Sequence, residues 1–183
     1  MPGYFQPPHG DVVDAVARAL AEDLQPLGDM TSGMLDPTIT ATAQMNARKP
    51  GRLAGCAPAA EAFRQVDDSI QIDWHFDDGD VLEAGSVIAD VKGPLTTILT
   101  AERTALNFIG HLSGIATRVN EFVQIADGRI GIWDTRKTTP GLRSLEKAAT
   151  RAGGGRNHRG NLSGWLMFKD NHLVAMTIGE AIE

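Results

Sequence analysis

Residues 134–172 form a cationic segment in an acidic chain. The segment holds eight lysine and arginine residues against three acids, so its formal charge is +5, whereas the whole chain has a net charge of −6. A nucleic-acid-binding domain usually has a pI above about 9, and the pI of this sequence is about 5.3. The segment therefore indicates a pocket for a small anion and argues against a nucleic-acid partner. Its basic residues are Arg136, Lys137, Arg143, Lys147, Arg151, Arg156, Arg159 and Lys169.

The apolar pattern around this cationic segment predicts a strand–helix–strand unit. Residues 129–133 and 165–168 are short apolar runs of the kind that buried parallel strands have. Between them, Pro140 can open a helix whose apolar residues recur every three or four positions, and Gly153 can cap its end. A βαβ unit of roughly 30 or more residues fits this spacing.

The cations next to the predicted strands are candidate ligand-binding residues. Arg136 and Lys137 follow the first predicted strand, and Lys169 follows the second. In barrel folds, the carboxyl ends of the strands carry the site. Arginine binds carboxylates or phosphates through two parallel hydrogen bonds, whereas lysine acts as a point charge. We therefore expect these side chains to meet around a carboxylate or a phosphate.

The glycine run and the basic residues of the predicted helix are two other candidates for contact with a ligand. The glycine run 153–155 would let the backbone come close to a ligand, and His158 and Arg159 follow it directly. Three basic residues lie inside the predicted helix, where a solvated basic helix face is the alternative to a role in the pocket. They are Arg143, Lys147 and Arg151.

The amino-terminal part of the chain predicts an α+β domain. Apolar residues at four-residue spacing predict a helix over 11–24, and alternation with period two predicts strands over 39–48 and 70–76. A short helix is expected over 57–66, and a long helix from residue 101 to about residue 127. The Gly-Asp and Gly turns of residues 79–91 are also typical of the hairpins of biotinyl or lipoyl carrier domains. However, these residues contain no lysine that could be modified.

Composition argues against several other classes of protein. The single Cys56 excludes an internal disulfide, and with no nearby histidine it indicates a small buried residue rather than a nucleophile. The first ten residues contain no apolar core of a signal peptide, and no apolar run approaches the ~20 residues of a membrane span. We expect a cytoplasmic protein that does not bind a membrane.

The cationic segment contains five ordered motifs: DTRKTTP (134–140), LEK (145–147), GGG (153–155), NHR (157–159) and KDNH (169–172). Together they resemble the quinolinate phosphoribosyltransferase family, also called nicotinate-nucleotide pyrophosphorylases (carboxylating). Residues 101–117 are similar to the family as well, so the resemblance extends from about residue 22 to residue 172.

The resemblance implies a fold and a reaction. The fold is α/β: an amino-terminal α+β sandwich-like domain, residues 1–112, is followed in residues 113–183 by the first βα units of an α/β barrel. In the implied reaction, quinolinate attacks the anomeric carbon of phosphoribosyl pyrophosphate and pyrophosphate leaves. Loss of the 2-carboxylate as carbon dioxide then gives nicotinate mononucleotide, a step in NAD biosynthesis.

The resemblance also implies roles for particular residues. Lys137 would be catalytic and would touch the phosphoribosyl donor. The family forms homodimers in which the arginine at the position of Arg103 enters the pocket of the neighbouring subunit. Magnesium would accompany pyrophosphate, with protein ligands beyond residue 183. The implied substrate-binding residues are Arg103, Thr135, Arg136, Lys137, Thr138, His158, Arg159 and Lys169.

Two departures from the family pattern leave alternatives open. Asn161 and Gly164 stand where the family usually has Gly and Asp. The family's barrel also continues for about a hundred residues more, since a complete barrel takes ~200 residues or more. We therefore expect the 183-residue chain alone to be catalytically incomplete. The alternatives are a module that only binds dicarboxylates, or a molybdenum-uptake-associated relative of the same fold.

Overall fold

The computed structural model describes residues 6–182. In chain order, its elements are α1 (His9–Leu24), the 3₁₀ helix η1 (Ser32–Met34), β1 (Thr40–Asn46), β2 (Gly51–Arg52), α2 (Cys56–Val66), β3 (Gln71–Trp74), β4 (Val81–Leu82), β5 (Val87–Pro94), α3 (Leu95–Ala126), α4 (Arg143–Ala152) and α5 (Ile178–Ile182).

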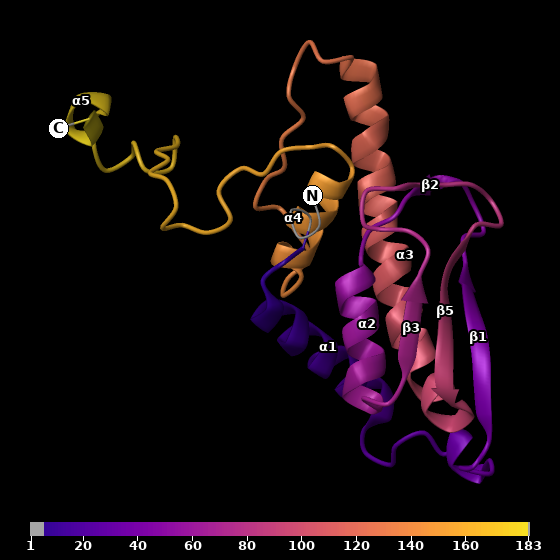
Figure 1. Cartoon of the computed structure of the whole chain (residues 1–183). Helices are drawn as coiled ribbons and strands as arrows, with labels where there is room; N and C mark the ends of the chain where they lie inside the picture. Colours follow the sequence, from indigo (N-terminus) through magenta and orange to yellow (C-terminus); the bar gives the residue numbers. More distant parts are fainter. Residues whose placement is uncertain (1–5, 183) are drawn as a thin grey trace.

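A three-stranded antiparallel sheet and three helices form the amino-terminal part. The strand order is β1-β5-β3, so β5 is the central strand, with Ala43 of β1 opposite Val91 and Asp73 of β3 opposite Asp90. A second, two-stranded sheet pairs β2 with β4. Figure 1 shows α2 and α3 on one side of the larger sheet, with α1 beside α2. The α+β architecture predicted for this part of the chain is confirmed.

The core of this part lies between the helices and the sheet. Its buried side chains include Val16 of α1, Phe63 of α2, Val91 of β5 and Leu112 of α3. Complete burial of such a side chain contributes about 1.5–3 kcal/mol. The helices predicted over 11–24 and 57–66 are confirmed, because their apolar positions are the ones that face this core.

The long helix α3 begins earlier than the sequence predicted. The prediction placed its start at Ala101, but the helix follows β5 without a loop and begins at Leu95. Pro94 has extended backbone angles and accepts a hydrogen bond from Thr97 Oγ1 at 3.2 Å, so the change from strand to helix occurs at the proline. The helix ends at Ala126, close to the predicted end, and runs unbroken through residue 112.

The helix predicted from Pro140 is present as α4, but it begins at Arg143. Gly141 has a φ of +81°, which is incompatible with a right-handed helix, so the chain turns before the helix begins. The predicted cap at Gly153 is confirmed, since its N–H donates to the carbonyl oxygen of Ala149.

The two strands predicted on either side of α4 are wrong. In place of the strand over 129–133, the structure has one isolated parallel bridge between Trp133 and Arg156. Residues 165–168 form no strand, and Leu166 is 89% exposed. A strand needs hydrogen bonds to neighbouring strands, and within residues 6–182 no strand lies beside either segment. The α/β barrel therefore stays a prediction.

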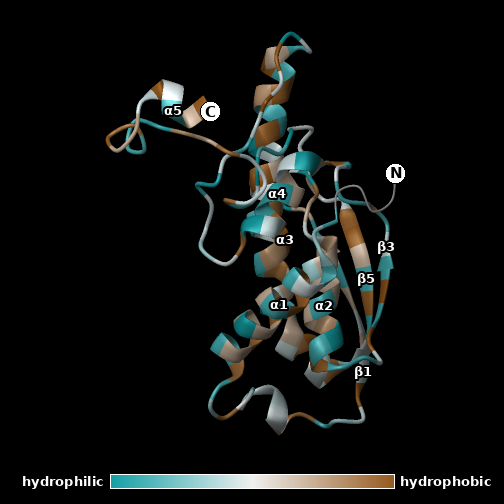
Figure 2. Cartoon of the chain, turned by 90° about the vertical axis from the view of Figure 1, so that its left-hand side faces the viewer, coloured by the Kyte–Doolittle hydropathy of each residue, from teal (hydrophilic) through white to brown (hydrophobic). Residues whose placement is uncertain are grey.

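The chain after Asn161 extends away from the rest of the molecule and ends near α5 (Figure 1). Figure 2 shows hydrophobic residues along this extended segment, among them Leu162, Trp165, Val174 and Ile178, which are exposed. Within the part of the chain that the structure describes, no helix is both long and apolar enough to cross a membrane.

Candidate functional site

A pocket of about 430 Å³ brings together most of the residues singled out from the sequence. Six of them line it, and they come from two loops that flank α4 and from the extended segment after Asn161. The pocket is lined by Asp134, Thr135, Arg136, Lys137, His158, Arg159, Met167 and Lys169. Arg103 and Thr138 are not among these residues, whereas Asp134 and Met167 were not predicted.

A short backbone contact places the two loops side by side. Arg156 N–H donates to the carbonyl oxygen of Ile132 at 2.8 Å, and Asp134 N–H donates to that of Arg156 at 3.0 Å. The first pocket loop starts at Asp134, at one end of this contact. The second pocket loop follows Arg156, at the other end. The cations therefore reach a common pocket although the regular strands predicted before them are missing.

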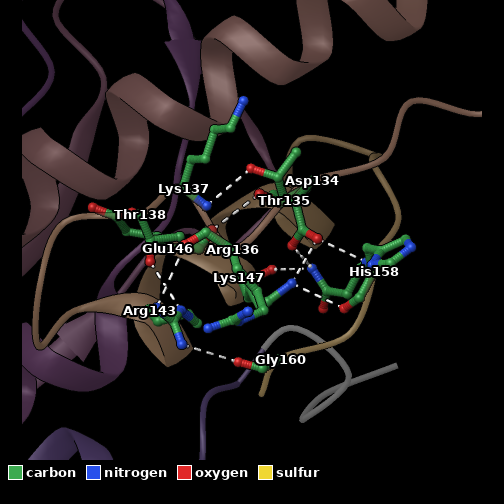
Figure 3. A network of polar contacts seen from close by, with 12 residues as sticks. Asp134, Thr135, Arg136, Lys137, Thr138, Arg143, Glu146, Lys147, His158 and Gly160 are labelled. Carbon is green, nitrogen blue, oxygen red and sulfur yellow. Dashed lines mark hydrogen bonds and ion pairs between the residues drawn. The ribbon is translucent and has the colours of Figure 1, made fainter. Parts of the chain in front are cut away.

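Asp134 connects the two loops to α4 (Figure 3). Its Oδ1 accepts from Lys147 Nζ at 2.6 Å and from the backbone N–H of His158 at 2.7 Å, while its Oδ2 accepts from Asn157 Nδ2 at 2.6 Å. Lys147 Nζ also donates to the carbonyl oxygen of His158 at 2.9 Å. Because the side chains of both partners are about 10% exposed or less, this is a buried ion pair.

The interpretation of the basic residues of α4 as a solvated face is therefore wrong for Lys147, and Arg143 is engaged as well. Arg143 Nε donates to Thr138 Oγ1 at 3.0 Å, and its terminal nitrogens donate to the carbonyl oxygens of Gly160 at 3.2 Å and of Arg136 at 3.4 Å (Figure 3). The Thr138 hydroxyl thus contacts α4 and does not face the pocket. Residues 145–150 of α4 are all buried, so this stretch of the helix has no solvated face.

Glu146 links the same loop to the long helix. Its Oε2 accepts from the backbone N–H of Thr139 at 3.1 Å, and its Oε1 lies 2.9 Å from His111 Nε2 on α3. The sequence reasoning missed the roles of Glu146 and Lys147. No signal in the sequence distinguishes these two charges from solvated ones, because their partners lie in other segments of the chain.

The extended segment forms one wall of the pocket through contacts with the second loop. Arg159 donates to the carbonyl oxygen of Trp165 at 2.9 Å and to Met167 Sδ at 3.5 Å. The rings of His158 and Trp165 meet edge to face with centroids 4.6 Å apart. These contacts bring Lys169 to the pocket rim.

The charge of the pocket favours an anionic ligand. Arg136, Lys137, Arg159 and Lys169 contribute four positive side chains. Among residues 6–182, the only acid that lines the pocket is Asp134, which is paired with Lys147. Arg136 Nε is buried and has no hydrogen-bond partner within the described residues. A buried donor without an acceptor is costly.

The glycine run packs against the long helix, and its approach to a ligand stays a prediction. A Cβ atom at Gly153 would lie 2.4 Å from the carbonyl oxygen of Ala116, and one at Gly155 would lie 2.8 Å from Val119 Cγ1. Both neighbours belong to α3. The glycines therefore allow the turn after α4 to pack closely against the long helix.

No protein donor set for a metal ion is found in the pocket. Among residues 6–182 no group of three or more His, Cys, Asp or Glu side chains could hold a metal ion. Within the described part of the chain, Asp134 is the only carboxylate in the lining, and its oxygens accept three hydrogen bonds. Magnesium prefers several oxygen ligands in octahedral geometry, so these residues do not fit a protein-bound magnesium ion.

A larger cavity, of about 650 Å³, lies between α1 and α4. Among the described residues, its lining has two acids, Asp11 and Asp14 of α1, and four cations, which are Arg18 of α1 and Arg143, Lys147 and Arg151 of α4. Within this lining, Lys147 is paired with Asp134, and Arg143 binds backbone carbonyl oxygens. We place the candidate site in the smaller, cationic pocket, because six of the eight site residues predicted from the sequence line it.

Comparison with known proteins assigns a family to both parts of the chain. Residues 29–113 match the family profile "Quinolinate phosphoribosyl transferase, N-terminal domain", and residues 115–183 match the corresponding C-terminal domain. A probable nicotinate-nucleotide pyrophosphorylase (carboxylating) of Bacillus subtilis is 48% identical over 149 residues, which are 81% of this chain and 52% of the relative. A mitochondrial quinolinate phosphoribosyltransferase (decarboxylating) of Nicotiana tabacum is 39% identical over 178 residues, 96% of this chain and 50% of the relative.

Solved structures agree with these matches. The crystal structure of NadC from Streptococcus pyogenes superimposes with a TM-score of 0.89 at 39% identity, covering 94% of this chain and 62% of that one. The nicotinate-nucleotide pyrophosphorylase of Francisella tularensis gives a TM-score of 0.87 at 40% identity, covering 91% and 60%. The chain spans about half the length of the curated relatives it matches. Two adjoining domain matches and the shared fold show that the chain belongs to the quinolinate phosphoribosyltransferase family.

Proposed function

We propose that the protein acts in phosphoribosyl transfer to quinolinate, and that the cationic pocket holds quinolinate. The observation that carries this proposal is the convergence of five predicted site residues on one pocket, in which Asp134, the one acid that the described part of the chain contributes, is already paired. The five residues are Arg136, Lys137, His158, Arg159 and Lys169. Quinolinate carries two adjacent carboxylates. A pocket with four fixed positive charges suits such a dianion, because charge-assisted hydrogen bonds are the strong ones.

The side chains divide naturally between the two carboxylates. Arg136 and Arg159 present planar guanidinium groups that can each bind a carboxylate through two hydrogen bonds, and Lys169 adds a point charge at the rim. In the structure, Arg159 is hydrogen-bonded to Trp165 and Met167. Quinolinate would compete for this guanidinium or bind on the side that these contacts leave open.

Lys137 is the proposed catalytic residue. In the reaction, the ring nitrogen of quinolinate forms the bond to the anomeric carbon, and the bond from that carbon to pyrophosphate breaks with its electron pair. Lys137 is exposed at the pocket, and its backbone N–H is held by Thr135 Oγ1 at 3.0 Å. A preplaced ammonium group there would stabilise the negative charge that develops on the leaving group. Carbon dioxide then leaves from the 2-position, and a proton takes its place on the ring.

We keep magnesium as part of the proposal only as a companion of the phosphoribosyl donor. The side chains in the pocket do not fit a protein-bound ion, and none of the roles above depends on one.

We also propose a homodimer in which Arg103 completes the neighbouring pocket. Arg103 lies on α3, is exposed, and does not line the pocket of its own chain. In a protein of the full length of its relatives, subunits carrying Arg103→Ala and subunits carrying Lys137→Ala should each be inactive. Mixing them should restore part of the activity, because one pocket of the mixed dimer keeps both residues. Absence of restoration despite measured subunit exchange would contradict a shared site.

The test of the reaction is to supply quinolinate, phosphoribosyl pyrophosphate and magnesium and to follow nicotinate mononucleotide by chromatography. Product that depends on both substrates and disappears in Lys137→Ala supports the proposed reaction. Quinolinate binding without product by the 183-residue chain agrees with the expectation that this chain alone is catalytically incomplete. The same result from a protein of the full length of the relatives supports a second candidate, a dicarboxylate-binding module. One observation favours that candidate: the binding cations come together within this chain, although the wall that carries Lys169 is not part of a sheet. Absence of both binding and product would contradict both candidates.

A further inference from the structure

Asp134 is a negative charge in the lining of a pocket that collects anions. Its carboxylate lies among Arg136, Lys137, His158 and Arg159 in the lining. An uncompensated carboxylate there would repel an anionic ligand and attract the cations that should bind it. The structure shows how this is avoided, because Asp134 Oδ1 lies 2.6 Å from Lys147 Nζ in a buried ion pair.

Lys147 neutralises Asp134 from outside the pocket. It projects from α4, is 7% exposed, and lines the cavity of about 650 Å³ between α1 and α4, whereas it is not among the residues that line the cationic pocket. It also binds the carbonyl oxygen of His158, and Arg143, one helical turn earlier, binds those of Arg136 and Gly160. The negative ends of three peptide groups from the pocket loops therefore face two cations of α4.

We propose that Lys147 is a positioning residue for dianion binding, which acts by neutralising Asp134 and so keeps the pocket positive. The inference rests on the proposed function, because it concerns how the same pocket selects its substrate class. Lys147 touches no ligand in this account. Its effect reaches the ligand through the charge of Asp134 and through the two loops that the ion pair connects.

A double-mutant cycle separates this role from simple support of the fold. The variants are Lys147→Met, which removes the charge at similar length, Asp134→Asn, and the double variant. The probes are phthalate, which has two adjacent carboxylates, benzoate, which has one, and quinolinate itself, each titrated by calorimetry. Arg64→Met is the matched control, since Arg64 also lies 2.6 Å from a buried carboxylate, that of Glu61, but is far in the sequence from the pocket and not part of its lining.

We expect Lys147→Met to weaken phthalate binding about tenfold or more and benzoate binding clearly less, because unpairing a buried charge affects a dianion most. The double variant should recover phthalate binding to within about threefold of the unmodified chain, as the uncompensated charge is then gone. Recovery need not be complete, since the amide introduced by Asp134→Asn would place a donor opposite Asn157 Nδ2. Arg64→Met should change neither ligand.

Three results would overturn the inference: unchanged phthalate binding in folded Lys147→Met, equal losses of phthalate and benzoate, or a double variant as weak as Lys147→Met. If circular dichroism shows that Lys147→Met does not fold, the phthalate-to-benzoate ratio of the double variant decides. A ratio within about threefold of the unmodified chain supports the inference, and a larger drop refutes it. An unmodified chain that binds phthalate but not quinolinate contradicts the proposed function alone, and one that binds neither contradicts both.

Discussion

The amino-terminal part, residues 9–126, and the cationic region, residues 129–182, are held together by different forces. In the amino-terminal part, paired strands and helices surround an apolar core that includes Val16, Leu53 and Phe63. The cationic region has one well-packed helix, α4, and its loops are joined by side-chain hydrogen bonds to Asp134, Arg143 and Glu146. The comparison teaches that the pocket is shaped by a polar network attached to α3 and α4, whereas the rest of the fold depends on apolar burial.

The largest expected effect tests this contrast with two identical substitutions. Leu53 is fully buried, and its replacement by alanine should lower the free energy of unfolding by about 2–5 kcal/mol. Leu166 is 89% exposed, so Leu166→Ala should change it by less than about 0.5 kcal/mol. Urea denaturation followed by circular dichroism measures both. Similar losses at the two positions would show that the extended segment is packed as firmly as the core.

The same contrast explains which parts of the fold could be predicted from the sequence. Helices α1 and α2 and strand β1 were found because their apolar spacing reflects the core that each of them faces. The strands expected over 129–133 and 165–168 have equally apolar sequences, but no neighbouring strand pairs with them in the described residues. An apolar pattern therefore indicates a tendency to form a strand, but a strand forms only where a neighbouring strand pairs with it.

For the candidate site, the sequence predicted which residues line the pocket better than it predicted which side chains are paired with one another. Arg136, Lys137 and Lys169 were identified from their places after predicted strands, and they line the pocket. The buried state of Lys147 could not be read in the same way, because it depends on Asp134, 13 residues earlier in the chain. A charged residue on a short helix looks the same in the sequence whether its partner is a carboxylate or water.

A smaller effect tests how the cationic region is attached to the long helix. Gly153→Ala should lower the free energy of unfolding by about 1–3 kcal/mol, because the new Cβ would lie 2.4 Å from the carbonyl oxygen of Ala116 and force the two helices apart. Gly114→Ala is the control within α3, where nothing lies within 4 Å, and should be neutral or stabilising by up to about 1 kcal/mol. Thermal unfolding of both variants gives the comparison, and a neutral Gly153→Ala would contradict close packing at this turn.

The smallest effect concerns a charge in the amino-terminal part. Hydrogen bonding to Arg64, and then to Gln65, lowers the pKa of Glu61 below its ordinary value of 4.5, although burial opposes the shift. Because the folded-state pKa is depressed, the stability from this pair is present above pH 4.5 and is lost as the pH falls through the folded-state pKa. Because Arg64 is exposed to solvent, the pair contributes about 1 kcal/mol or less to the free energy of unfolding. Urea denaturation of the unmodified chain and of Glu61→Gln at several pH values below 5 checks it. A constant difference between the two proteins would contradict the prediction.

The most direct test of the account is calorimetric titration of the chain with quinolinate, compared across Arg136→Ala, Arg159→Ala and the exposed control Arg64→Ala. If the cationic region is a dicarboxylate pocket, the unmodified chain binds quinolinate, and each of the two pocket variants weakens binding by about 1.5–3 kcal/mol, the range for hydrogen bonds to charged groups. Arg64→Ala should leave the affinity unchanged. Equal losses in all three variants, or no binding by the unmodified chain, would contradict the assignment of the pocket.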